Sequence, residues 1–177
     1  EPLTDAQVEA LADFLLDEHK ALATYEAVMD TFGTIEPFAS IAAAEEQHIT
    51  ALERVFTRYG VALPEVPSFD VPAFETPEAA AQVAVQAEID NAALYDRLTA
   101  TFTQTDVLRV MDNLSRASLE NHLPAFEAFA NGEPLPAESH LGASAPQGGR
   151  GMRGAGASGQ GRTDPDAAPR GTAGCEA

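Results

Sequence analysis

The chain has 177 residues, of which 45% are hydrophobic, and a formal net charge of −18 at pH 7. This length is enough to bury the core of one domain, and no apolar run approaches the roughly 18 residues that a membrane-spanning helix needs. The acidic surface repels nucleic acid and anionic membranes. A single cysteine, Cys175, excludes an internal disulfide and a cysteine-rich zinc module.

The charge and composition divide the chain into two parts. Residues 1–142 carry a net charge of −19, whereas residues 143–177 sum to +1. The second part centres on GGRGMRGAGASGQGR, which lacks the apolar residues that a folded core needs. We therefore predict a folded domain over residues 1–139 and a disordered Gly/Ala/Arg-rich tail over residues 140–177. The first residue, Glu1, suits an exported protein whose signal has been removed and equally a cytoplasmic one.

The first helix is predicted to begin after Thr4, which with Gln7 has the pattern of a capping box, and to end at Gly33. The second is predicted between Pro37, a residue typical of a first helical position, and Gly60. Residues at helical spacing define the inner faces of both helices. They are Leu11, Leu15, Glu18, Leu22, Tyr25 and Met29 in the first, and Ile41, Glu45, His48, Leu52, Val55 and Tyr59 in the second.

Residues 61–75 contain three prolines and are predicted to be an extended connection. A third helix follows, with Thr76 as its cap and Pro77 at its first position. A fourth is predicted to open at Thr103 or Thr105 and to end before Gly132. Their inner faces carry Val85, Glu88, Ala92 and Tyr95 in the third, and Leu108, Met111, Ser115, Leu119, His122, Phe126 and Phe129 in the fourth.

Two short loops and one long middle connection predict an all-α four-helix bundle with a crossover, the arrangement of ferritin-like folds. The two halves also resemble each other. DEHKALATYEAV, at residues 17–28, matches AEIDNAALYDRL, at residues 87–98, which pairs Glu18 with Glu88 and Tyr25 with Tyr95. His48 pairs with His122 in the same way. Two helical hairpins of similar design are expected to pack face to face.

Five polar residues occupy the inner faces of this predicted bundle. Burying several carboxylates without cations is costly, and none of the inner faces supplies a Lys or Arg. A metal is therefore the simplest explanation. Carboxylate-bridged di-iron and di-manganese sites take one Glu from each of two helices and a Glu-x-x-His motif from each of the other two. The sequence supplies five of these six ligands: Glu18, Glu45, His48, Glu88 and His122.

The sixth ligand is missing, because Leu119 stands three residues before His122 where the motif has Glu. Glu120 would point away from the site in a regular helix. Pro124 disturbs the helix here, since it lacks an N–H and clashes with the carbonyl of Glu120. Such a distortion could turn Glu120 toward the site, where it would contact the metal or its ligands. Tyr25 and Tyr95 are expected to pack beside the site with their hydroxyls bonded to carboxylates.

Four segments together carry a family resemblance over about residues 5–130: DEHKALATYEAVMDTFG, PFASIAAAEEQHITALERVFTRYG, AEIDNAALYDRL and ENHLPAF. They resemble a bacterial and archaeal ferritin-like domain family that is catalogued as a domain of unknown function. The resemblance implies a ferritin-like bundle related to rubrerythrins and ferritins. It also implies that Glu18, Glu45, His48, Glu88 and His122 match ligand positions of the wider superfamily, from which Leu119 departs.

Two classes of function follow from these observations. The first is a di-iron or di-manganese oxidoreductase of the ferroxidase or peroxidase type. The second is a metal-binding or sequestering bundle without turnover that holds one ion, and behind both stands a purely structural bundle with a hydrogen-bonded polar centre. The expected partners are one or two iron or manganese ions, with no nucleic acid and no membrane span. A homodimer is one assembly that the predicted bundle allows.

Overall fold

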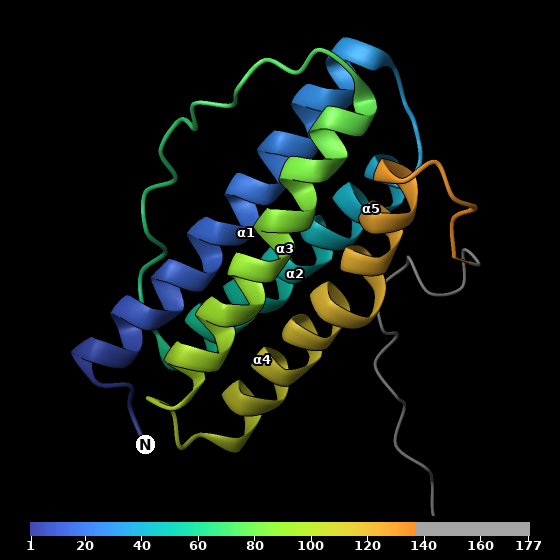
Figure 1. Ribbon diagram of the computed structural model, residues 1–177. Helices are drawn as coiled ribbons and strands as arrows, with labels where there is room; N and C mark the ends of the chain where they lie inside the picture. Colours follow the sequence, from blue (N-terminus) through green and yellow to red (C-terminus); the bar gives the residue numbers. More distant parts are fainter. Residues whose placement is uncertain (137–177) are drawn as a thin grey trace, which may run out of the picture. The chain divides into compact units, whose positions relative to one another are not determined.

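A computed structural model describes residues 1–136 of the chain, and the predicted tail over residues 140–177 lies outside this range. Within the described residues the ordered elements are all helical. Helix α1 spans Asp5–Phe32 and α2 spans Phe38–Tyr59, and the two pack along each other as a hairpin (Figure 1). Helix α3 spans Pro77–Thr99. The fourth helical rod consists of three segments, α4, η1 and α5. The predicted four-helix bundle is confirmed.

The ends of the helices follow the capping residues in the sequence. The Gln7 N–H donates to Thr4 Oγ1 at 3.3 Å, and the Thr4 N–H donates to Gln7 Oε1 at 3.0 Å, which completes the predicted capping box. Thr76 caps α3 by accepting from the Ala79 N–H. Gly60 ends α2 with a φ of 65°, a left-handed conformation in which a side chain would be strained.

The connection between α2 and α3 runs from one end of the bundle to the other (Figure 1). As a result α2 and α3 run in the same direction, whereas α1 and the α4–α5 rod run opposite to them. Half-buried Val61 and Phe74 anchor the two ends of this crossover, because each packs against a different apolar cluster of the core. Between them, residues 65–68 are exposed. The prediction of a long extended crossover is thus confirmed.

The fourth rod is not the single regular helix that the sequence predicts. Helix α4 spans Thr105–Ala117, a π-helical turn η1 spans Ser118–His122, and α5 spans Leu123–Ala130. The Leu123 N–H donates to the carbonyl of Ser118, five residues back. Pro124 explains the wider turn, because its ring excludes an α-helical bond to the residue four back. One extra residue is accommodated, which rotates the side chains that precede His122.

The core consists of two apolar clusters separated along the length of the bundle. One contains Phe14, Leu52 and Met111, and the other contains Phe38, Ile41 and Phe126. The inward polar residues occupy the intervening positions on each helix, as Glu18 does between Leu15 and Tyr25. Apolar packing on both sides therefore encloses them. No helix among residues 1–136 is long and apolar enough to cross a membrane.

Candidate metal centre

The structure brings together the five residues that the sequence singled out as ligands. They come from all four helical rods of the bundle, and each residue is at least 95% buried. Their ligand atoms form two groups, within each of which the atoms lie no more than 4.8 Å apart. The groups are Glu18, Glu45 and His48, and Glu45, Glu88 and His122. Glu45 belongs to both, so a carboxylate lies between two potential ion positions.

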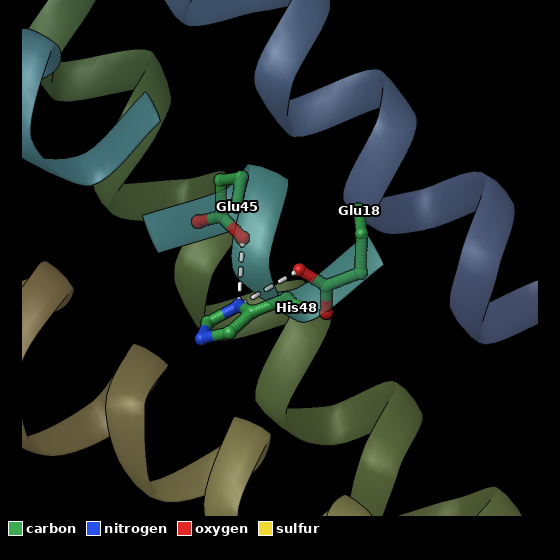
Figure 2. A group of neighbouring side chains, drawn as sticks. All are labelled: Glu18, Glu45 and His48. Carbon is green, nitrogen blue, oxygen red and sulfur yellow. Dashed lines mark hydrogen bonds and ion pairs between the residues drawn. The ribbon is translucent and has the colours of Figure 1, made fainter. Parts of the chain in front are cut away.

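The first group joins α1 to α2. His48 Nδ1 lies 2.8 Å from Glu45 Oε2 and 3.1 Å from Glu18 Oε2. Figure 2 shows both carboxylates turned toward this one ring nitrogen. Glu45 and His48 are three residues apart, which places them on one face of α2. Glu18 comes from the facing helix α1, so three potential donors converge on one point.

The second group contains a buried nitrogen without a hydrogen bond. His122 Nδ1 lies 3.1 Å from Glu45 Oε1 and 3.5 Å from Glu88 Oε2. Despite these distances it makes no hydrogen bond with any residue that the structure describes. The two imidazole rings stack with their centroids 5.4 Å apart. Its contacts with the two carboxylates are ion pairs without hydrogen-bond alignment, so this buried nitrogen is a candidate metal ligand.

Two tyrosines support the carboxylates, as expected, but they do so crosswise between the halves. The Tyr25 hydroxyl on α1 donates to Glu88 Oε1 on α3 at 2.6 Å, and the Tyr95 hydroxyl on α3 donates to Glu18 Oε1 on α1 at 2.5 Å. Each tyrosine thus binds the glutamate of the other hairpin, not the one seven residues before it. The internal repeat in the sequence becomes a reciprocal pair of bonds in the structure.

A hydrogen-bonded pair that the sequence analysis missed lies beside Glu18. Ser118 donates to Asn91 Oδ1 at 3.0 Å, and the Asn91 amide donates to Asp17 Oδ2 at 2.9 Å and to Glu18 Oε1 at 3.3 Å. Asn91 lies three residues after Glu88 on α3, and this spacing could have identified it. Ser118 was hidden by the π-helical turn, which the spacing of a regular helix does not predict.

The structure contradicts the inner position predicted for Leu119, and it does not turn Glu120 toward the site. Leu119, expected on the inner face, is 43% exposed, and Ser118 is buried in its place. Glu120, expected as a candidate support of the site, lies on the exposed face and forms an ion pair with Arg116 at 2.9 Å. The extra residue in the turn η1 rotates both positions outward.

Burial and close contacts shift the pKa values of Glu18 and Glu45 in opposite directions. Burial, together with the nearby charge of Glu45, raises the pKa of Glu18 to about 6. Burial also acts to raise the pKa of Glu45, but its close contacts with Glu18, His122 and His48 outweigh it and lower that pKa to about 2. Glu45 is therefore the carboxylate of this pair that stays ionised most readily.

The two histidines hold their protons strongly in the metal-free protein. Burial acts to lower the pKa of His48, yet the charge of Glu18 and the hydrogen bonds to Glu18 and Glu45 raise it to about 10. Burial likewise opposes the charged form of His122, and the charge of Glu88 with contacts to Glu45 raises its pKa to about 9. Two imidazolium charges thus partly balance the carboxylates. Divalent ions would replace these protons at the same ring nitrogens.

The donor set is compatible with metal binding in both chemistry and placement. Three carboxylates and two imidazoles are oxygen and nitrogen donors of the kind that bind divalent metal ions in proteins. The two groups share the carboxylate of Glu45. In the second group, the buried His122 Nδ1 makes no hydrogen bond within the described residues. Buried tyrosines hold the outer oxygens of Glu18 and Glu88 in place. The residues present can therefore hold metal ions.

Comparison with known proteins agrees with this fold. No family model matches the chain, and no curated protein matches its sequence. Among solved structures, a hypothetical protein from Methanococcus jannaschii is similar with a TM-score of 0.66 and 19% identity, over 80% of this chain and 92% of that one. A humanized archaeal ferritin is similar with a TM-score of 0.59 and 16% identity, over 73% of this chain and 84% of that one. The fold is ferritin-like. At these identities the similarity concerns the fold alone.

Proposed function

We propose that the bundle binds two ions of iron or manganese, one at each carboxylate–histidine group, and that it acts as an oxidoreductase of the ferroxidase or peroxidase type. The observation that supports this proposal best is His122 Nδ1. This atom is buried, lies 3.1 Å from the carboxylate common to both groups, and lacks a hydrogen bond within the described residues. A metal ion between the ring and Glu45 would satisfy it.

Carboxylate ligands suit this chemistry because hard anionic oxygens stabilise the oxidised form of the metal. The residues of the two groups would hold a metal pair that could supply two electrons, one from each ion, and with two protons from solvent this is the requirement for reducing hydrogen peroxide to two water molecules. The protein residues hold and orient the ligands. Tyr25 and Tyr95 each fix one oxygen of a carboxylate and leave the other toward the histidines. With one cysteine in the chain, a cysteine-ligated electron-transfer centre cannot form within it, so turnover would require an external reductant.

The proposal is tested by loading the protein with ferrous iron without oxygen and then adding hydrogen peroxide or air. We expect a rise in ferric absorbance that is faster than that of the same iron in buffer. Glu45→Ala should abolish this acceleration, because Glu45 contributes to both groups. Glu46→Ala is the matched control, since Glu46 is the next residue of α2 and is exposed. Equal rates for the natural chain and Glu45→Ala would contradict the proposal.

A second candidate function is metal binding without turnover. The Ser118–Asn91 hydrogen bond favours it. Ser118 is a buried residue of the turn on which a second Glu-x-x-His motif would provide a carboxylate, and it bonds to the neutral Asn91 of α3, which in turn contacts Glu18. The site then offers three carboxylates, so less negative charge offsets two divalent ions than a fourth carboxylate would provide. Stoichiometric metal binding with no acceleration of iron oxidation would support this second function over the first.

A further inference from the structure

A cavity of about 380 Å³ lies between α1, α3 and the crossover. Its inner end is formed by Tyr25, Glu45 and Glu88, so it reaches the candidate metal centre. Ala21 of α1 and Ala87 of α3 line it on the two helices, and small side chains at these positions leave the space open. The cavity thus connects the outer surface of the bundle to the second carboxylate–histidine group.

The crossover covers this cavity with residues 69–72, among which Phe69 and Val71 are half-buried. Pro72 also lines it, and proline fixes its own backbone φ angle. The crossover is anchored on either side of the cavity by Val61 and Phe74 in the apolar clusters. Residues 69–72 therefore form the outer wall of the cavity, and the crossover that contains them also connects α2 to α3.

The size and lining of the cavity favour an organic molecule over an ion or a diatomic gas. Its volume falls within the range of about 300–1,000 Å³ that is typical of small-molecule sites, whereas one water molecule takes up roughly 30 Å³. Apolar groups from Ala21, Phe69, Val71, Val83 and Ala87 form much of its wall. Polar groups are concentrated at the inner end and at the outer rim, which is the usual arrangement for orienting a partly apolar ligand.

The charges around the cavity select against anions. Asp17, Asp70 and Asp90 lie at its border, and Lys20 is the cation among its lining residues. Two further glutamates close the inner end. The net charge of the whole chain, −18, acts in the same direction. A carboxylate or phosphate ligand would meet unfavourable electrostatics from entry to the inner end, whereas an uncharged or cationic molecule would not.

We propose that this cavity is the binding site of a small organic molecule, uncharged or cationic, with an apolar body that lies beneath the crossover and one end that contacts Glu88 and Glu45. The binding site itself depends on the cavity alone. Its role as the place where the substrate or reductant of the metal centre binds rests on the proposed function. Because ligand and metal would contact the same carboxylates, each should change the affinity of the other.

The site can be probed with 1-aminoanthracene, an uncharged fluorescent molecule, added to the full chain in the presence of a chelator. We expect saturable binding to a single site. Ala87→Phe, which fills the cavity from α3, should weaken binding by about tenfold or more, a size of effect typical of changes in the fit of an apolar pocket. Ala93→Phe is the matched control, because Ala93 is exposed on the same helix and does not line the cavity.

Two further arms keep the result interpretable. Phe69→Asp places a charge in the cover without altering helix packing, and it should also weaken binding if Ala87→Phe fails to fold. The anionic probe 1-anilinonaphthalene-8-sulfonate should bind at least about tenfold more weakly than 1-aminoanthracene, because of the surrounding carboxylates. Equal binding by the natural chain and both cavity variants would overturn the proposed site. Equal binding of the two probes would overturn the charge preference.

Metal content, measured separately on the same proteins, distinguishes this inference from the proposed function. Ala87→Phe should retain the metal content of the natural chain, since Ala87 supplies no ligand atom. Loss of probe binding with metal content intact assigns the probe to the cavity. Probe binding by a natural chain that takes up no metal would support the cavity and contradict the metal centre.

Discussion

Tyr25 of α1 donates a hydrogen bond of 2.6 Å to Glu88 of α3, and both residues are buried. It joins the two halves of the bundle at the candidate metal centre. Burial and the charge of Glu88 raise the pKa of the Tyr25 hydroxyl well above its usual value, which favours its role as a hydrogen-bond donor. The bond thus fixes one oxygen of Glu88 and leaves the other facing His122.

Removing this hydroxyl should destabilise the metal-free protein. In Tyr25→Phe, a buried carboxylate oxygen loses its donor, and we expect a loss of about 1–3 kcal/mol in the free energy of unfolding. Tyr59→Phe is a suitable control, because its hydroxyl bonds to Asp106 near the surface and should cost less. Urea denaturation in the presence of a chelator measures both. Equal losses for the two variants would show that the Tyr25 bond has no special structural role.

Ser118, four residues before His122, is buried, whereas Leu119 is exposed. A carboxylate introduced at residue 118 should therefore affect stability and metal binding more than one introduced at residue 119. Ser118→Asp adds a buried negative charge near the carboxylates. The free energy of unfolding of the metal-free protein should therefore fall by at least about 1 kcal/mol and at most by several kcal/mol. Added manganese should recover this loss. Leu119→Glu should change the stability of the metal-free protein by no more than about 0.5 kcal/mol, because residue 119 is on the exposed face. It should change the stabilisation by added manganese by no more than the same amount.

Thermal unfolding of both variants, with and without manganese, checks this prediction. The expected pattern is a lower midpoint for Ser118→Asp without metal and a larger increase on adding metal than the natural chain shows. A larger metal response in Leu119→Glu than in Ser118→Asp would contradict the turn as the structure shows it.

The sequence predicted more of the centre than of the turn next to it. Glu45 and His48 could be found because a regular helix places residues three apart on one face. Ser118 could not be found in this way, because one inserted residue in the turn breaks that periodicity. The crosswise partners of Tyr25 and Tyr95 depend on how the hairpins face each other, which helix spacing does not specify. Caps such as Thr4 and Thr76 are local signals, and they correctly marked the helix starts.

Metal binding should release protons. At pH 7 both histidines of the metal-free centre are protonated, since their pKa values are raised to about 10 and about 9. Filling both groups with metal therefore displaces about two protons per chain. Isothermal titration with manganese in buffers of different ionisation enthalpy measures this number. Heats that do not depend on the buffer would contradict the protonated state of the histidines.

Stability of the metal-free protein should fall as the pH rises. The pKa values of His48 and His122 lie above the usual 6.5, so their contribution is fully present below pH 6.5 and is lost as the pH rises through about 9 and then 10. The raised pKa of Glu18 acts in the same direction between about pH 4.5 and 6. Denaturation at pH 6.5 and pH 10 should show the decrease. His122→Gln should reduce it, and an unchanged decrease in that variant would argue against the assignment.

The metal content of the purified protein, measured after dialysis against ferrous iron or manganese without oxygen, tests the central claim most directly. Glu45 is the residue common to both groups. The account predicts about two ions per chain in the natural protein and in Glu46→Ala, and strong loss of both ions in Glu45→Ala, because a shared carboxylate supports both positions. A natural chain that retains no metal, or a Glu45→Ala variant that retains two ions, would contradict it.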